Sequence, residues 1–218
     1  FVVRNGAKSN VRYAAIKRDQ ETLNSYLKSL TLVDINQFNR FSDRQRLAFL
    51  INAYNAFTVK LIVDNYPLAS IKKLGGFFSS PWKIGFFKLF GDTAYLDKIE
   101  HEIIRKQFDE PRIHFALVCA ARSCPALRDE AFTADKLDAQ LQNAAAAFLN
   151  DSDRNFFDAG SKTLHLSKIF DWYGEDFVSR FGSVKGFVAP IIAKNQGEEE
   201  LIKSNSVAVT YLNYDWVL

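Results

Sequence analysis

The chain has 218 residues, 48% of them hydrophobic, and its 28 basic and 25 acidic residues give a formal net charge of +3 at pH 7. This length and apolar content are sufficient for one well-packed core. The charges are spread along the chain and no basic run is interleaved with aromatic residues, so the sequence predicts no nucleic-acid binding. No apolar stretch reaches the roughly 18 to 20 residues that span a bilayer, so no membrane span is expected.

The chain contains no methionine, so Phe1 is not a translational start. A cleaved signal peptide would leave this trace, and so would a trimmed chain. The only cysteines, Cys119 and Cys124, lie five positions apart and could form a disulfide in an oxidising compartment. Their spacing matches neither a CxxC redox motif nor a zinc knuckle, and only three scattered histidines accompany them, so no metal and no cofactor are predicted.

The N-terminal residues 1–41 are expected to form a helical segment packed on the rest of the domain. Residues 14–32 carry apolar side chains at helical spacing, and residues 34–41 are expected to add one more helical turn. Ser42 is suited to cap a long helix over residues 44–66, which Pro67 would end. That helix is apolar on nearly every side, so it is predicted to be buried.

Asn52, Tyr54 and Asn55 are the residues of this helix with candidate roles in a site. Asn52 and Asn55 are three residues apart and therefore share one face. One interpretation is that their amides bond the backbone of neighbouring loops, because buried polar groups are normally satisfied. The other is that these residues, with Tyr54, line a site and bind a substrate or hold a catalytic side chain.

The next segment contains a loop, a hairpin and the start of a helix. Residues 71–81 form a Gly/Ser-containing loop suited to the rim of a site, and Gly91-Asp92 between two apolar runs predicts a hairpin over residues 82–96. Asp97-x-x-Glu100 has the spacing of a capping box, which gives Glu100 a structural role as a helix cap. His101 is then expected on the solvent side of that helix.

Residues 113–127, IHFALVCAARSCPAL, are the segment around which the candidate chemistry is organised. The apolar run predicts a buried strand, followed by a polar loop and a helix that begins at Pro125. Cys124 would then occupy the cap position, where the backbone dipoles favour a thiolate. The residues alone therefore indicate Cys124 as a reactive sulfur at the end of a strand.

The C-terminal third continues the mixture of helices and strands. Thr133 is expected to cap a helix over residues 134–149, Ser167 to cap the aromatic segment that follows it, and residues 184–193 to be helical. Residues 162–166 and 206–212 predict short strands, the first carrying His165 in a structural role. The fold class is therefore α+β, a helix-rich single domain over residues 1–218 around a small, mostly antiparallel sheet.

Several segments, in order along the chain, resemble the Domain-of-Unknown-Function 547 family. They are LINAYNAF (50–57), LDKIEHEIIR (96–105), PRIHFALVCAARSCPALR (111–128), LSKIFDWYGEDF (166–177) and the terminal YDW. The resemblance extends from about Val11 to the C-terminus, and its most specific parts are Asn-Ala-Tyr-Asn and His-x4-Cys-x4-Cys-Pro. It implies a bacterial protein of secreted or periplasmic type.

The resemblance also implies a thiol-hydrolase-like site on a papain- or transglutaminase-like fold. In it Cys119 is the nucleophile, His114 or His101 the base and Glu100 the orienting carboxylate. Cys124 is the more variable cysteine of the family pattern, so Cys119 ranks first and Cys124 second. On a regular strand His114 and Cys119 would point to opposite faces, and the choice between the two histidines therefore stays open.

Two functions from different classes follow. The first is a cysteine-dependent hydrolase or acyltransferase that acts on an amide or thioester of a small molecule or peptide, with Asn52 and Asn55 as oxyanion or substrate donors. The second is a non-catalytic periplasmic binding module in which Cys119 and Cys124 form a disulfide. Its protein partner would bind an exposed aromatic surface made of Phe77, Phe78, Trp82 and Phe86. A dithiol–disulfide redox protein is disfavoured because the cysteine spacing is wrong for one.

Overall fold

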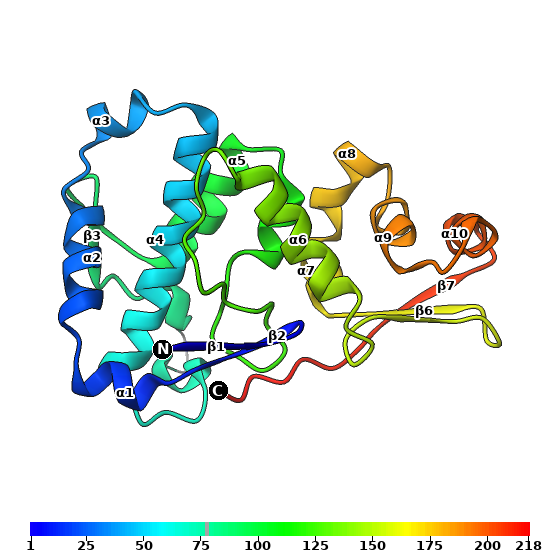
Figure 1. Cartoon of the computed structure of the whole chain (residues 1–218), viewed down its shortest axis with the longest axis horizontal. Coiled ribbons are helices and arrows are strands. Elements are labelled where there is room, and N and C mark those ends of the chain that lie inside the picture. Colours follow the sequence, from blue (N-terminus) through cyan, green and yellow to red (C-terminus); the bar gives the residue numbers. More distant parts are fainter. Residues whose placement is uncertain (77–78) are drawn as a thin grey trace.

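The structure is a computed structural model that describes residues 1–76 and 79–218. Phe77 and Phe78, which the sequence assigns to a partner surface, lie outside the described residues. The described part is rich in helices and contains small sheets that are mostly antiparallel, which confirms the α+β prediction (Figure 1). A papain- or transglutaminase-like fold stays a prediction.

The long helix α4 (Asp43–Asp64) forms the centre of the first half of the molecule (Figure 1). Ser42 caps it as predicted, because its hydroxyl accepts from the Gln45 amide while the Gln45 side chain accepts from the Ser42 amide. Leu50, Ile51 and Ile62 are completely buried. Contrary to the sequence-based expectation, α4 is long and apolar enough to cross a membrane, but 67% of its apolar window is buried within the fold, as in a core helix.

Helices that precede α4 in the sequence pack against it. The predicted helical segment is present as α1 (Tyr13–Arg18), α2 (Glu21–Thr31) and α3 (Ile35–Asn39). A hairpin that the sequence analysis did not predict precedes them, with β1 (Val2–Asn5) antiparallel to β2 (Lys8–Val11). These short strands carry no long apolar run, so their pattern is weak in the sequence.

The predicted hairpin near Gly91 is confirmed. Strand β3 (Phe87–Leu89) pairs antiparallel with β4 (Asp92–Ala94). Phe90 and Gly91 in the turn both have positive φ angles, 55° and 89°, the combination that joins two strands with the correct twist. Short helices η1 (Ile71–Leu74) and η2 (Pro81–Lys83) precede it, and Phe87 and Leu89 complete the first core together with α4.

A second core lies in the C-terminal half. Its strands are β5 (Phe156–Asp158), β6 (Thr163–Leu166) and β7 (Ala208–Tyr211), and β6 pairs antiparallel with β5 but parallel with β7. Its helices are α6 (Leu137–Leu149), α7 (Ile169–Tyr173), η5 (Gly174–Phe177), α8 (Val178–Phe181), α9 (Val184–Ile192) and α10 (Gln196–Lys203). The predicted strands and helices of this part are therefore confirmed, whereas α6 begins at Leu137, after Lys136 and not after Thr133.

Residues 113–127 differ from the prediction. Pro111–Phe115 form a 3-10 helix (η4) instead of a strand, and no helix begins at Pro125. A short apolar run fits a buried strand and a buried helical turn equally well, so its periodicity could not distinguish the two. Ile113 and Leu117 belong to the first core and Phe115 to the second, so this segment joins the two cores.

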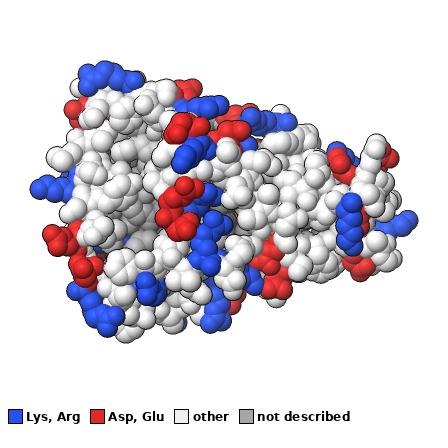
Figure 2. All heavy atoms as spheres, in the orientation of Figure 1, with Lys and Arg blue, Asp and Glu red and all other residues white. Residues whose placement is uncertain are grey.

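The charged side chains on the face drawn in Figure 2 are of both signs and lie close to one another. Several charged side chains of the described residues are paired, including Arg112 with Glu110 and with Asp138. On this face the structure therefore presents a mixed surface and no continuous basic one.

Candidate active or binding cavity

A cavity of about 240 Å³ lies between the two cores and contains most of the predicted site residues. The chain has three tryptophans, and all of them line this cavity. Its described lining residues are Tyr54, Trp82, Asp97, Glu100, His101, His114, Leu117, Cys119, Pro125, Ile169, Trp172, Tyr173, Tyr214 and Trp216. These residues come from six separate segments, so only the tertiary fold brings them together.

Glu100 and His101 lie on a π-helical segment, η3 (Lys98–Ile104), which continues into α5 (Arg105–Gln107). Asp97 makes no capping hydrogen bond there, so the prediction that Glu100 belongs to a capping box was wrong. Glu100 is instead buried, with 6% of its surface exposed, and lines the cavity. Wide π turns inside helices are frequent at functional sites.

Glu100 dominates the electrostatics of this end of the cavity. Burial raises the pKa of Tyr54 well above its ordinary value, and the charge of Glu100 and a hydrogen bond to it raise it further. The same causes, in the same order, raise the pKa of Tyr173. Within the described residues Glu100 has no ion-pair partner. The groups that hydrogen-bond to it are the neutral hydroxyls of Tyr54 and Tyr173.

The neighbouring Asp97 adds a second carboxyl group to the lining. Burial raises the pKa of Asp97, while nearby His101 works in the opposite direction. The two side chains are 3.9 Å apart between His101 Nε2 and Asp97 Oδ1. Arg105 Nη1 lies 3.1 Å from the other ring nitrogen of His101, Nδ1. Since a guanidinium can only donate, Nδ1 is the acceptor in this hydrogen bond.

His114 is buried and held by an aspartate that the sequence analysis did not single out. Its Nε2 lies 2.7 Å from Oδ2 of Asp176, and Arg105 donates two further hydrogen bonds of 2.7 Å to the same carboxylate. Burial raises the pKa of Asp176, but the bonds from His114 and Arg105 outweigh it, and the net pKa lies well below its ordinary value. The His114 ring also stacks on Tyr173 at 4.0 Å, which fixes its plane.

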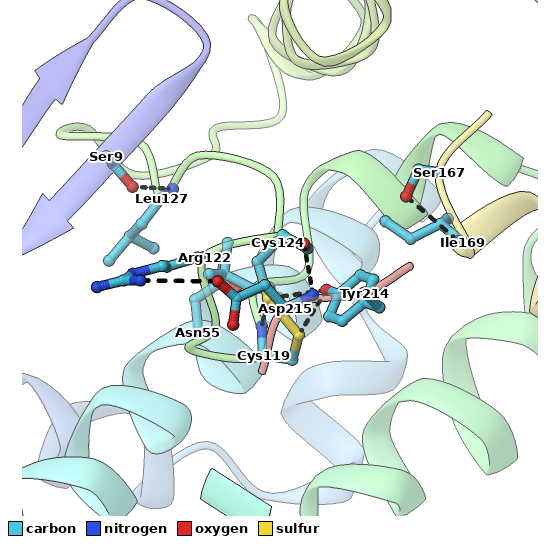
Figure 3. The surroundings of a disulfide bond; sticks show 12 residues. Ser9, Asn55, Cys119, Arg122, Cys124, Leu127, Ser167, Ile169, Tyr214 and Asp215 are labelled. Atoms are coloured by element: carbon cyan, nitrogen blue, oxygen red, sulfur yellow. Dashed lines mark hydrogen bonds and ion pairs between the residues drawn. A yellow bond between two sulfur atoms is a disulfide. The ribbon is translucent and has the colours of Figure 1, made fainter. Parts of the chain in front are cut away.

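Cys119 and Cys124 form a disulfide, with their Cα atoms 6.2 Å apart. Cys119 lines the cavity, and the hydroxyl of Tyr214 lies 3.2 Å from each sulfur (Figure 3). The backbone amide of Cys119 also donates to the sulfur of Cys124. Within the described residues neither cysteine is free.

The disulfide loop is held from several directions (Figure 3). Asn55 donates to the Ala116 carbonyl and accepts from the Val118 amide, at 2.8 and 2.9 Å. On the other side the amides of Arg122 and Ser123 donate to carbonyls of the C-terminal segment, those of Val217 and Asp215. Ser9 of the N-terminal hairpin accepts from the Leu127 amide, which ties down the end of the loop.

The side-chain amides of Asn52 and Asn55 therefore form hydrogen bonds with backbone groups, in agreement with the first of the two interpretations. Asn52 bonds both the amide and the carbonyl of Phe132, as Asn55 does for the segment before Cys119. Both lie beside a different groove, of about 500 Å³, between the N-terminal helices and residues 127–132. They do not line the cavity that contains Glu100 and Cys119.

The structure thus brings together Tyr54, Glu100, His101, His114 and Cys119, whereas Cys124, Asn52 and Asn55 lie behind the cavity wall. The catalytic and substrate-binding roles assigned to these residues stay predictions. Of the four aromatic residues assigned to a partner surface, Trp82 lines the cavity and Phe86 packs on the first core. Among the described residues no group of three or more His, Cys, Asp or Glu side chains could hold a metal ion.

Sequence reasoning missed the residues that complete the site, which are Trp172, Tyr173, Asp176, Tyr214 and Trp216. All five lie in the segment LSKIFDWYGEDF and the terminal YDW. The clustering of aromatic residues in these two segments was the available signal.

No curated protein and no solved structure matches the chain. A family model does match, over residues 38–149, which is a little over half of the 218 residues. The matched region includes α4, η3 and the disulfide loop, and therefore Tyr54, Glu100, His101, His114 and Cys119. The chain belongs to the family described as Protein of unknown function, DUF547.

Proposed function

We propose that the protein is a non-catalytic binding module that holds a small molecule in the aromatic cavity. The observation that carries this proposal is the disulfide in the cavity wall, which occupies both cysteines of the chain. A thiolate is the reactive form of cysteine, and a disulfide sulfur cannot serve as one. The bond instead fixes the loop that forms one side of the cavity.

The cavity itself has the composition of a ligand site. Binding pockets are concave, mostly apolar and lined by aromatic side chains with a few polar groups that orient the ligand. Here tryptophan and tyrosine side chains supply the aromatic lining, and Glu100 and His114 are buried polar groups facing the same space. The hydrogen bonds from Asn55 and from the C-terminal segment hold the wall in one conformation, which lowers the entropy that binding would cost.

We further propose that the protein works in the periplasm or is secreted. Disulfides form and persist in oxidising compartments, and the Cys119–Cys124 bond supports such a location.

A thiol titration combined with ligand screening tests the binding proposal. We expect no reactive thiol in the native, unreduced protein and two after unfolding in reductant. Because every tryptophan lines the cavity, a bound molecule should change the intrinsic tryptophan fluorescence. Two reactive thiols in the native protein, or a chemically broad screen without any fluorescence change, would contradict the proposal.

One observation favours a second candidate, a cysteine-dependent hydrolase or acyltransferase active only after reduction. Cys119 and His114 line the same cavity, and Asp176 bonds the His114 ring as the third member of a catalytic triad would. With the disulfide reduced by a dithiol, the Cys119 sulfur would attack an acyl carbon as its proton passes to His114. The imidazolium would return that proton to the leaving group, and water would then release the acid.

Alkylation with iodoacetamide after mild reduction tests this candidate. It predicts that Cys119 is labelled faster than Cys124 and that His114→Ala slows the labelling of Cys119. Equal labelling of both sulfurs, unchanged by His114→Ala, would exclude the activated thiol and leave the binding proposal intact.

A further inference from the structure

We infer that the ligand of the cavity is a small organic cation, whose alkylated ammonium group lies against the aromatic rings and beside Glu100. This inference rests on the proposed binding function and specifies the chemical class that the cavity selects. Three features carry it, namely the arrangement of the rings, the buried carboxylate without an ion-pair partner and the absence of lysine and arginine among the described lining residues.

The aromatic wall is one continuous cluster centred on Trp216. The ring centroid of Trp216 lies 5.4 Å from that of Trp82, 5.7 Å from that of Trp172 and 4.6 Å from that of Tyr214. Trp172 and Tyr214 also contact each other, at 4.9 Å. The faces of aromatic rings carry negative potential, and groups of such rings are the usual receptor for quaternary and methylated ammonium ions.

Glu100 supplies the charge on another part of the lining. It is 94% buried, since only 6% of its surface is exposed, and it raises the pKa of both Tyr54 and Tyr173 by its negative charge. A buried carboxylate without a cationic partner is costly, because desolvation removes far more than neutral hydrogen bonds return. A bound cation would provide the missing partner.

The charges around the cavity leave room for such a cation. Of the described residues that line it, two are carboxylic acids, Asp97 and Glu100, and none is lysine or arginine. Arg105 lies over the ring of Tyr173, but it makes two hydrogen bonds to Asp176. The described lining therefore holds two carboxyl groups and no lysine or arginine.

Two of the protein's own cations already lie over rings of the lining. The ammonium of Lys72 lies 4.3 Å from the ring centroid of Trp216, and the guanidinium of Arg105 lies 5.1 Å from that of Tyr173. Neither side chain lines the cavity. Rings of this lining therefore already attract cations within the protein.

The volume limits the size of the ligand. At about 240 Å³ the cavity is smaller than the roughly 300 to 1,000 Å³ of sites for drug-sized molecules. It suits a small cation of the size of choline, or the cationic end of a longer molecule.

Three compounds of nearly equal shape and different charge test the inference. They are choline, its neutral isostere 3,3-dimethylbutan-1-ol and the anion 3,3-dimethylbutanoate, each titrated against the oxidised wild-type protein by tryptophan fluorescence and calorimetry. We expect choline to bind at least 10-fold more tightly than the neutral compound and the anion not to bind. Glycerophosphocholine carries the same cationic group at the end of a larger molecule. If it binds as tightly as choline, the cavity is open enough to accept the cationic end of a longer ligand; if it binds more weakly, the ligand is a free small cation.

Glu100→Gln keeps the shape of the side chain and removes its charge. It should weaken choline binding about 10-fold or more and leave binding of the neutral compound unchanged. The matched control is Glu102→Gln, on the same helix but exposed and outside the cavity lining, which should leave both affinities unchanged. Circular dichroism and thermal unfolding establish that each variant is folded.

The outcomes separate the inference from the function on which it rests. If the neutral compound binds as tightly as choline and Glu100→Gln changes neither affinity, the cavity binds ligands without selecting cations and the inference is overturned. If choline does not bind but a neutral or anionic molecule from the screen does, the inference also falls and the binding function stands. Preferential choline binding that is lost in Glu100→Gln supports both.

Discussion

His114 places its Nε2 2.7 Å from Oδ2 of Asp176, although 62 residues separate the two in the chain. The bond fixes the His114 ring against Tyr173 and orients it at the wall of the cavity. Because His114 belongs to the segment that joins the two cores and Asp176 to the second one, this contact couples the geometry of the site to the packing between them.

Replacing Asp176 by Asn should destabilise the protein by about 2 kcal/mol at pH 7, because His114 and Arg105 lose a charged acceptor. The pKa of Asp176 is lowered in the folded state, so its contribution is complete above the ordinary pKa of about 4 and is lost as the pH falls below that value. Urea unfolding of both proteins at pH 7 and in acid measures the difference.

The difference between wild type and Asp176→Asn should therefore shrink in acid. Asp171→Asn, which removes an exposed pairing with Lys168 in the same part of the chain, is the control and should change stability by less than about 0.5 kcal/mol. A gap between wild type and Asp176→Asn that is equal at both pH values would contradict the assigned role.

Removing the disulfide should lower the free energy of unfolding by about 2 kcal/mol, since the closed loop is short and its closure removes little chain entropy. For a chain of this length that corresponds to a decrease of about 4 to 8 °C in the unfolding temperature. The double variant Cys119→Ala/Cys124→Ala and the reduced wild type should show the same loss, by calorimetry. The double variant has no disulfide to reduce. If a reductant destabilised it further, the stability lost on reduction would not come from breaking the disulfide.

Replacing Asn55 by Leu should cost about 3 kcal/mol, because the Ala116 carbonyl and the Val118 amide would both lose a buried partner. It should also weaken ligand binding, since Val118 directly precedes Cys119 in the cavity wall. Asn39→Leu, at an exposed position at the end of α3, provides the control for the change in side chain. Unchanged stability and unchanged binding in Asn55→Leu would contradict the role of Asn55 in holding the cavity wall.

Alkaline titration should reveal tyrosines that resist ionisation. Burial raises the pKa of Tyr54, Tyr173 and Tyr214 above the ordinary value of about 10. Their contribution to stability is complete below that value and is lost as the pH rises above it, because the unfolded chain then releases phenolic protons that the folded chain retains. Absorbance at alkaline pH should therefore show fewer ionised tyrosines in the native protein than in urea.

Tyr214→Phe refines this measurement, since it should remove one late-ionising group and leave the rest of the profile unchanged. If all eight tyrosines of the native protein ionise together near pH 10, the burial of the cavity wall is not as the structure has it.

Much of the local structure could be predicted from neighbouring residues. The capping of α4 by Ser42 and Gln45, the hairpin around Gly91 and the strands β6 and β7 depend on contacts or patterns within a few positions. The segment before Cys119 was predicted wrongly as a strand, because an apolar run of that length has no unique local structure when both its sides are buried.

The set of candidate residues also came from the sequence. The residue pattern by itself indicated an α+β chain, and the resemblance to the family pointed to Glu100, His101, His114 and Cys119. Only the tertiary structure decided that these residues line one cavity, that the cysteines are joined and that Asp176 is the partner of His114. The physical reason is that caps and turns form between residues close in sequence, whereas the cavity exists only where two separately packed cores meet.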